Sequence, residues 1–222
     1  MEHSEKQKTQ VTATGKRSWQ TKNHLLLGVA IAGVVTFLLL AYFVSQGQTL
    51  GFDTSVLLYV NAAASGWQDA AWQGITDLGG SVAVTLIVVV TAGVLWSRGR
   101  ISNALQFAMS VAGAMALSSI LKLLFSRERP ELWQQLITET THSFPSGHAI
   151  ASSAITLSVV VLLWRTKWRT WAILAGLVYV GLISYSRLYL GVHYPTDIVA
   201  GWLVSITWVS LMVIAFTRRR VY

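Results

Sequence analysis

The chain has 222 residues and a net charge of +8; 53% of the residues are hydrophobic and only 12% are charged. A soluble domain usually carries about twice that share of charged residues, so the composition excludes an ordinary soluble globule and favours a polytopic membrane protein. Cysteine is absent, which excludes a disulfide framework, a thiolate nucleophile and a cysteine-ligated metal.

The first predicted element is a polar, basic segment over residues 1–23. It has too few apolar residues to form a core, so we expect a short disordered tail on the cytoplasmic side. No small-residue cleavage site stands out after it, and the apolar segment that follows is expected to be an uncleaved anchor. The membrane domain is predicted over residues 24–217, and a basic cytoplasmic tail over residues 218–222.

Six apolar segments are long enough, or nearly so, to cross a bilayer, which requires about 20 residues. They are Leu25–Val44, Ser81–Trp96, Ala104–Phe125, Ala149–Trp164, Trp171–Tyr189 and Ile198–Phe216. The predicted fold is therefore an all-α bundle of six transmembrane helices. Between the first two segments, N-cap residues from Asp53 onward and a helical spacing of apolar residues predict one or two short amphipathic helices on the outer face. These helices either cover a site or simply pack on the bundle.

The positions of Lys and Arg predict the orientation of the bundle. All but four of the 17 lie in the two tails or in the connections after the second and fourth segments, which share one side of the membrane if there are six crossings. By the positive-inside rule this side is cytoplasmic, and so are both termini. Because the charge follows the topology, no nucleic-acid partner is expected. The four exceptions are Lys122, Arg127, Arg129 and Arg187.

These outer cations indicate a functional site, because charges at the edge of apolar segments cost free energy. Lys122 supplies a point charge, whereas Arg129 and Arg187 supply planar guanidinium groups that bind phosphate oxygens in bidentate fashion. Pro130 disfavours a helix at Arg129 and predicts a loop there. Ordinary snorkelling at helix ends is the alternative. Arg127 either does similar work or pairs with a neighbouring glutamate, and it is left outside the predicted site.

Ser146-Gly147-His148 opens the fourth apolar segment. A helix N-terminus presents free backbone N–H groups and a partial positive charge, which favour an anion. Gly147 lets the backbone approach closely, while Ser146 caps the helix, donates its hydroxyl to phosphate, or does both. His148 lies at the same edge and is the candidate general acid for the leaving group.

His193 is the candidate nucleophile, because neutral imidazole attacks phosphorus and forms a phosphohistidine. Asp197 follows about one helical turn later, where its carboxylate can accept the other ring N–H and stabilise the imidazolium. His148, His193 and Asp197 are also metal-capable groups, but three nearby cations would repel a dication, so no metal is expected. His142 lacks such neighbours and is predicted to be a solvated loop residue.

Together, three motifs resemble the signature of the type 2 phosphatidic acid phosphatase (lipid phosphate phosphatase) superfamily. They are Lys122 with six residues before Arg129-Pro130, then Pro145-Ser146-Gly147-His148, then Ser186-Arg187 with five residues before His193 and three more before Asp197. The resemblance implies a six-helix bundle with an outward-facing site and metal-independent hydrolysis without a cofactor. It implies that His193 is the nucleophile, Asp197 its partner and His148 the acid. The implied phosphate-binding residues are Lys122, Arg129, Ser146, Gly147 and Arg187.

The resemblance to bacterial members also implies a location and a substrate class. We expect a multi-pass enzyme of the bacterial cytoplasmic (inner) membrane, acting from the outer side on a lipid phosphomonoester or diphosphate. Undecaprenyl diphosphate is favoured; phosphatidylglycerol phosphate, phosphatidate and diacylglycerol diphosphate stay open. The alternative is an anionic-lipid transporter or flippase without hydrolysis, which would use the same cationic helix ends but gives the histidines no role. Nothing in the sequence indicates the oligomeric state.

Overall fold

The computed structural model describes the backbone of residues 2–218 and the side chains of residues 23–216. Within this part of the chain there are eight helices and no strand, as the predicted all-α class requires. The helices are α1 (Glu2–Ser45), α2 (Leu50–Ala62), α3 (Gly66–Asp77), α4 (Ser81–Ser97), α5 (Ile101–Phe125), α6 (Gly147–Leu163), α7 (Arg169–Tyr189) and α8 (Pro195–Arg218).

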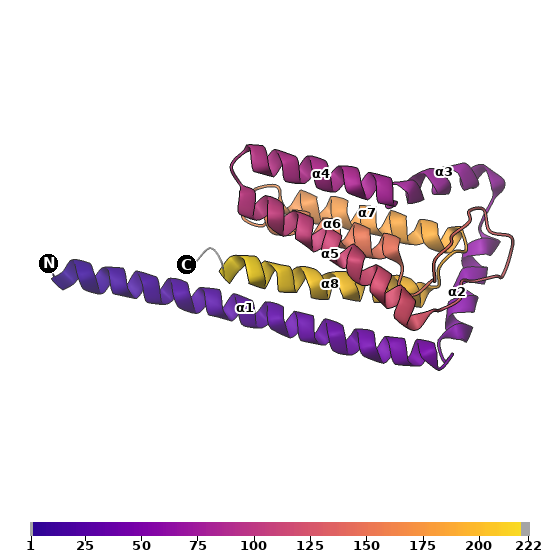
Figure 1. The fold of residues 1–222 in the computed structure, drawn as a ribbon, viewed down its shortest axis with the longest axis horizontal. Helices are drawn as coiled ribbons and strands as arrows, with labels where there is room; N and C mark the ends of the chain where they lie inside the picture. The colour runs from indigo at the N-terminus through magenta and orange to yellow at the C-terminus, as the bar shows by residue number, and fades with distance from the viewer. Residues whose placement is uncertain (1, 219–222) are drawn as a thin grey trace.

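The body of the molecule is formed by helices that lie side by side, namely α1, α4, α5, α6, α7 and α8 (Figure 1). Helix α6 contacts α5, α7 and α8, and α1 packs along α8. Helix α2 crosses one end of the bundle, where it contacts α7 and α8, and α3 continues the line of α4 (Figure 1). The short α4–α5 and α6–α7 connections lie at the opposite end. The two ends of the bundle are therefore built differently.

Four helical segments are long and apolar enough to cross a membrane. They are Asn23–Ser45, Ile101–Phe125, Arg169–Tyr189 and Pro195–Phe216. Helices α3 and α4 together qualify as a fifth crossing with a 41° bend, whereas α6 is apolar but has only 17 residues. The structure thus agrees with a multi-helix membrane protein, while the number of six crossings stays a prediction.

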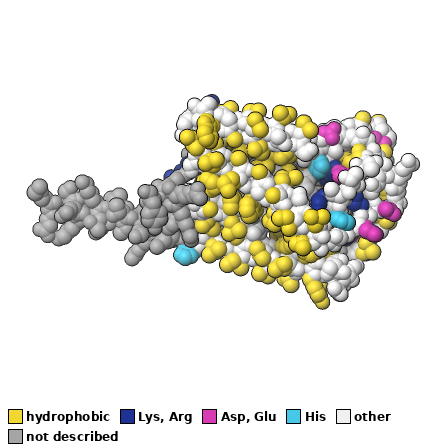
Figure 2. Space-filling model, viewed as in Figure 1, with side chains coloured by type: hydrophobic (Ala, Val, Ile, Leu, Met, Phe, Trp, Pro, Cys, Tyr) yellow, Lys and Arg dark blue, Asp and Glu magenta, His cyan; other side chains and the backbone are white. Residues whose placement is uncertain are grey.

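Large apolar side chains cover the outside of the bundle. On α4, for example, Val82, Leu86 and Val89 are each more than half exposed. Figure 2 shows apolar side chains spread over the body of the molecule, while acidic side chains gather at the end that holds α2 and α3. An apolar surface of this extent would be unfavourable in water and is typical of contact with lipid.

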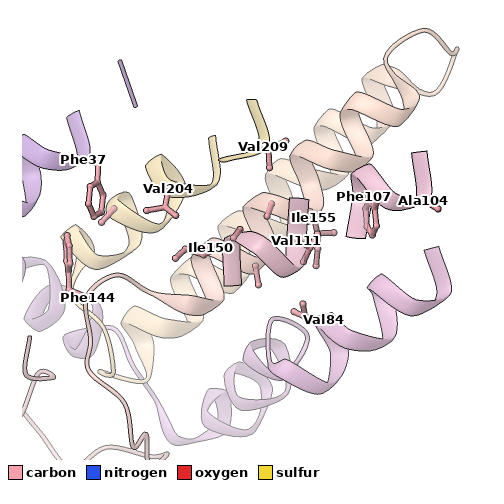
Figure 3. Close-up of a cluster of buried hydrophobic side chains, with 14 of the residues drawn as sticks. Phe37, Val84, Ala104, Phe107, Val111, Phe144, Ile150, Ile155, Val204 and Val209 are labelled. Carbon is pink, nitrogen blue, oxygen red and sulfur yellow. The ribbon is translucent and has the colours of Figure 1, made fainter. Parts of the chain in front are cut away.

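The core anchors the connection that leads into α6. Phe37 from α1, Ile150 from α6 and Val204 from α8 belong to one buried cluster, and Phe144 joins it from the α5–α6 connection (Figure 3). The ring centroid of Phe144 lies 5.8 Å from that of Phe37 and 5.1 Å from that of Phe125. Full burial of a Phe side chain contributes about 1.5–3 kcal/mol. This anchor fixes the chain just before the N-terminus of α6.

Helix α8 passes very close to the N-terminus of α6 at Gly201. A Cβ atom there would lie 2.9 Å from the carbonyl oxygen of Ser146 and 3.0 Å from the Cβ of Ala149. Small residues at helix contacts allow such close approach in membrane proteins. The missing side chain of Gly201 therefore brings the starts of α6 and α8, and the two histidine motifs they carry, next to each other.

The segment between the first two long helices forms two short helices, as predicted. However, α2 begins at Leu50, and Asp53 lies inside its first turn as a fully buried residue instead of capping it. The cap position is Thr49, whose side chain makes no capping hydrogen bond. The tertiary partners of Asp53, which lie far away in the sequence, explain this difference and are described below.

The backbone of residues 2–22 is helical and continuous with α1. Propagation from an existing helix adds one hydrogen bond per ordered residue, so a long apolar helix extends readily into polar neighbours. The division into two cytoplasmic tails and a membrane domain stays a prediction. Of the predicted C-terminal tail, Arg218 ends α8 and the remainder lies outside the described residues.

Candidate active site

The end of the bundle beside α2 collects the charged ends of four helices. Helices α5 and α7 end there, whereas α6 and α8 begin there (Figure 1). Accordingly, Lys122 lies in the last turn of α5, His148 at the start of α6, Arg187 in the last turn of α7 and Asp197 in the first turn of α8. Motifs spread over the second half of the sequence thus meet in one place.

His193 lies in the connection between α7 and α8 and is almost fully buried. Its Nδ1 lies 3.4 Å from Oδ2 of Asp197, which also accepts a 2.9 Å hydrogen bond from the backbone N–H of Tyr194. This pairing assigns the ring proton to Nδ1 and leaves the lone pair on Nε2, 3.4 Å from Nη1 of Arg129. Burial, followed by the charges of Arg187 and Arg129, lowers the pKa of His193 well below its usual value. The ring is therefore neutral near pH 7.

Asp197 has a second partner, Arg127, which the sequence analysis left outside the site. Nη1 of Arg127 donates a 2.6 Å hydrogen bond to Oδ1 of Asp197, and Nη2 donates a 2.8 Å hydrogen bond to Asp53. Asp53 also accepts from the backbone N–H and the hydroxyl of Thr196, which ties α2 to the first turn of α8. Arg127 therefore supports the histidine's carboxylate and does not pair with a neighbouring glutamate. No local spacing in the sequence could reveal Asp53 as its partner.

Arg129 and Lys122 share an anchor beside His193. Arg129 donates to the carbonyl oxygens of Val192 at 2.7 Å and Thr141 at 2.8 Å. Nζ of Lys122 donates to the hydroxyl of Thr141 at 2.8 Å. Arg129 lies in a segment without helix or strand, as Pro130 predicted. These bonds hold two cations near His193, and both interact electrostatically with its ring.

Arg187 is the most deeply buried of the cations. Its side chain is only 1% exposed, and its Nη1 donates a 2.9 Å hydrogen bond to the hydroxyl of Thr76 at the end of α3. Its Nε has no hydrogen-bond partner among the described residues. A buried guanidinium with an unused N–H is suited to bind an additional anionic oxygen.

Glu139, which the sequence analysis missed, bridges the two guanidinium groups. Its Oε1 forms a salt bridge with Nη2 of Arg187, and its Oε2 lies 3.5 Å from Nη2 of Arg129. Burial raises the pKa of this carboxyl, but the guanidinium groups of Arg187 and Arg129 outweigh that effect and lower the pKa to about 2. Glu139 is therefore ionised at neutral pH.

The N-terminus of α6 closes another side of the site. The Oγ of Ser146 accepts from the backbone N–H of Ala149 at 3.4 Å, which confirms the predicted cap. The backbone N–H of Ser146 donates to the carbonyl oxygen of Asp197 at 3.0 Å. A Cβ on Gly147 would meet no protein atom closer than 3.6 Å, so the protein itself does not require glycine there. That direction faces α5, since the nearest atoms are Oγ of Ser118 at 3.6 Å and Cε of Met115 at 4.0 Å.

The two histidines face the same set of charges. Both His148 and His193 interact electrostatically with Lys122, Arg129 and Arg187. The ring of His148 also lies near the turn between α3 and α4, where a Cβ on Gly79 would be 3.2 Å from its Cδ2. By contrast, His142 is exposed, as predicted for a loop residue.

A comparison with known protein families matches residues 103–220 to the PAP2 superfamily. The match covers more than half of the chain. The chain belongs to the PAP2 superfamily. All eight predicted site residues lie inside the matched segment, whereas α2 and α3 lie outside it. Asp53 and Thr76, which contact Arg127 and Arg187, therefore come from a part of the chain that the family match does not include.

Curated PAP2-type relatives of the chain are named as phosphatases. It is 28% identical to phosphatidylglycerophosphatase B of Bacillus subtilis over 177 residues, which cover 77% of this chain and 86% of that enzyme. It is 31% identical to decaprenylphosphoryl-5-phosphoribose phosphatase of Mycolicibacterium smegmatis over 154 residues, covering 67% of this chain and 81% of that enzyme. It is 45% identical to the undecaprenyl-diphosphatase of Sulfolobus acidocaldarius over 73 residues, which span 33% of this chain and 32% of that enzyme.

Two solved structures share the fold. One is the transmembrane PAP2 type phosphatidylglycerolphosphate phosphatase from Bacillus subtilis, with a TM-score of 0.75 at 24% identity, covering 87% of this chain and 97% of that chain. The other is LpxE from Aquifex aeolicus, with a TM-score of 0.61 at 20% identity, covering 73% of this chain and 94% of that chain. The arrangement of helices around the site is thus a PAP2 arrangement.

Proposed function

We propose that the protein is a membrane phosphatase that hydrolyses a phosphomonoester or diphosphate of a lipid through a phosphohistidine intermediate, without a metal. The observation that carries the proposal is the orientation of His193: Nδ1 faces Asp197, and Nε2 faces the cationic groups. Membership of the PAP2 superfamily and the phosphatase names of the relatives support it.

In the proposed first step, Lys122, Arg129 and Arg187 bind the nonbridging oxygens together with the N-terminus of α6. Positive charge and N–H donors placed around the transferring group stabilise the charge that develops there. Nε2 of His193 then forms a bond to phosphorus as the bond to the leaving oxygen breaks. Asp197 stabilises the imidazolium that results, and Arg127 keeps that carboxylate in place.

In the same step His148 protonates the leaving oxygen, so that the lipid departs as an alcohol or as a lipid monophosphate. In the second step His148 takes a proton from water, the water oxygen attacks phosphorus, and the N–P bond breaks. Inorganic phosphate leaves and His193 returns to its neutral form. Three cations around this space disfavour a dication, which is why the proposed mechanism is metal-independent.

We favour undecaprenyl diphosphate as the substrate, converted to undecaprenyl phosphate on the outer face of the cytoplasmic (inner) membrane. One relative named for this activity is 45% identical over the segment it shares. Phosphatidylglycerol phosphate is the main competitor, because the relative that matches most of this chain is named for it. Phosphatidate and diacylglycerol diphosphate complete the proposed substrate class.

The test is phosphate release by the purified protein in detergent, with EDTA present, on these four lipids and a soluble phosphate ester. We expect turnover of at least one lipid, inhibition by vanadate, which mimics five-coordinate phosphorus, and no inhibition by EDTA. His193→Ala should abolish release, while His142→Ala, in an exposed loop, should not. If the folded protein releases phosphate from none of the four lipids, the result would contradict the proposal and favour lipid transport without hydrolysis.

A further inference from the structure

We infer that Glu139 competes with the substrate's phosphate for the guanidinium groups of Arg187 and Arg129, and that it thereby makes the site selective for doubly charged phosphate groups over singly charged phosphodiesters. The inference rests on the proposed function, since it concerns how the same site chooses its substrate. It assigns a specificity-determining role to a residue outside the three sequence motifs.

The first argument is the place of the carboxylate. Its two oxygens face two different guanidinium groups, those of Arg187 and Arg129, in the way that two oxygens of a phosphate would. Electrostatic interactions also link Glu139 to Lys122 and His148. The carboxylate thus lies where the cations of the site converge, between the proposed phosphate-binding residues and not on their outer side.

The second argument is that the carboxylate of Glu139 leaves one N–H donor of Arg187 without an acceptor. Arg187 is buried, yet its Nε finds no partner among the described residues while Glu139 is bound to its Nη2. A buried donor without a partner costs free energy, about 1–3 kcal/mol for a typical group. A carboxylate has two oxygens, whereas a terminal phosphate presents three. Replacement of Glu139 by phosphate would therefore supply the missing acceptor.

The third argument is that the side chain of Glu139 can rotate away from the two guanidinium groups. Its side chain is 24% exposed, whereas that of Arg187 is 1% exposed. It belongs to the α5–α6 connection, which is fixed on one side by hydrogen bonds from Gln135 to the carbonyl oxygens of Pro130 and Gly191 and on the other by buried Phe144. Rotation of the Glu139 side chain outward would clear the position while the connection keeps its fixed points.

The selectivity follows from the charges. Because the pKa of Glu139 is lowered to about 2, protonation does not remove its charge near pH 7, and an incoming anion must displace it. A phosphodiester carries one negative charge, so it exchanges one monoanion for another and gains no Coulomb energy. A phosphomonoester or diphosphate end carries about two negative charges and gains from the same cations. Specificity here is a difference of affinities created by a competing group.

The experiment is a direct binding titration of the detergent-solubilised protein at about pH 8 with inorganic phosphate, mainly a dianion, and with dimethyl phosphate, a monoanion. Wild-type protein should bind phosphate in preference to dimethyl phosphate. In Glu139→Gln both ligands should bind more tightly, and the preference should shrink by at least about fivefold, within the range of typical coupling between sites. Glu131→Gln, an exposed glutamate of the same connection, is the matched control and should behave like wild type.

Weaker phosphate binding by Glu139→Gln would overturn the inference, because it would show that the carboxylate only positions the guanidinium groups. An unchanged preference would overturn it as well. If Glu139→Gln does not fold, Glu139→Asp provides the second variant: its shorter side chain should bridge the two guanidinium groups poorly and give an intermediate preference. Lipid turnover by the wild type is measured in parallel, so that a failure of hydrolysis is recognised separately from a failure of this competition.

Discussion

At the scale of single residues, the carboxylate of Asp197 divides its two oxygens between two tasks. Oδ2 faces the ring of His193, while Oδ1 accepts from Arg127. Arg127 in turn binds Asp53, so one guanidinium is shared by two buried carboxylates. Removal of one member of a buried charged set leaves the others uncompensated, which usually costs more than the set contributes when complete.

We predict that Arg127→Gln lowers the free energy of unfolding by about 3–5 kcal/mol, because the buried carboxylates of Asp53 and Asp197 then lose the cation that binds both. The catalytic turnover should fall as well, since Asp197 loses one of the contacts that orient it. Thermal unfolding in detergent and phosphate release measure the two effects. Arg98→Gln, at an exposed position, is the control. A variant as stable as the wild type would show that the charged set is not cooperative.

A second prediction concerns the dependence of activity on pH. His193 must be neutral to attack, and burial together with Arg187 and Arg129 depresses its pKa well below 6.5. The neutral form is present above the depressed pKa and is lost only as pH falls through it. We therefore expect kcat/KM, corrected for substrate ionisation, to stay high at pH values where an ordinary histidine is half protonated. An acid limb with its midpoint near 6.5 or higher would contradict this account of the site.

The eight candidate residues could be selected from the sequence because the spacing within each motif is local and their chemistry is specific; their roles stay a prediction. The four-residue step from His193 to Asp197 brings the two side chains together, with His193 just before α8 and Asp197 in its first turn. Glu139 has no such signal: it lies in a connection without regular structure, and only the folded chain brings it between two guanidinium groups. Asp53 carried a misleading signal, since an aspartate early in a helical pattern is usually a cap.

At the scale of elements, the turn between α3 and α4 is packed against the site. A Cβ on Gly79 would lie 2.7 Å from Cγ2 of Ile183, which is fully buried on α7, and 3.2 Å from the ring of His148. Tyr179 reinforces the contact through a 2.8 Å hydrogen bond from its hydroxyl to the carbonyl oxygen of Leu78. The absence of a side chain at Gly79 lets this turn approach α6 and α7.

We predict that Gly79→Ala reduces kcat while changing KM little, because the added methyl group must displace Ile183, His148 or the turn itself. Small misplacements of a catalytic group cost up to about 100-fold in rate. Steady-state kinetics on the preferred lipid would measure the effect. Gly74→Ala, in α3 with no atom within 4 Å of the added Cβ, is the matched control. Equal kinetics for both variants would mean that the turn does not position His148.

The helices could be predicted from the length of the apolar segments and from the charged and polar residues that separate these segments. Each of the six expected apolar segments coincides with a helix, and the two short helices, α2 and α3, lie between the first two segments. The contacts that join α2 to α7 and α8 could not be predicted, because they depend on buried polar bonds between distant residues such as Asp53 and Thr196. Apolar helix faces resemble one another, so they do not specify which neighbours pack together.

At the scale of the whole molecule, the two ends of the bundle carry different chemistry. The site lies at the end beside α2, whereas the α6–α7 connection at the other end combines cations with exposed tryptophans. There the guanidinium of Arg169 lies 5.2 Å from the ring of Trp164, and Lys167 lies 5.5 Å from the ring of Trp168. Such pairs are typical of a membrane–water interface on the cytoplasmic side.

We predict that the site end faces outward and the α6–α7 connection faces the cytoplasm. The chain has no cysteine, so single substitutions can be labelled without removing native thiols. Leu136→Cys, in the α5–α6 connection, should react with an impermeant maleimide in intact cells. Thr166→Cys, in the α6–α7 connection, should react only after the membrane is permeabilised. The opposite pattern would reverse the proposed orientation and place the substrate in the inner leaflet.

The shortness of α6 has a consequence for the surrounding lipid. Its 17 residues span about 25 Å at 1.5 Å per residue, less than the roughly 30 Å of a typical hydrocarbon layer. A helix that ends early places its N-terminus below the level of the headgroups, unless the bilayer thins around it. A lipid phosphate would then have to sink toward the site, by a distance that grows with bilayer thickness. In liposomes of increasing acyl-chain length, turnover should decline, which would couple this chemistry to the mechanical state of the membrane.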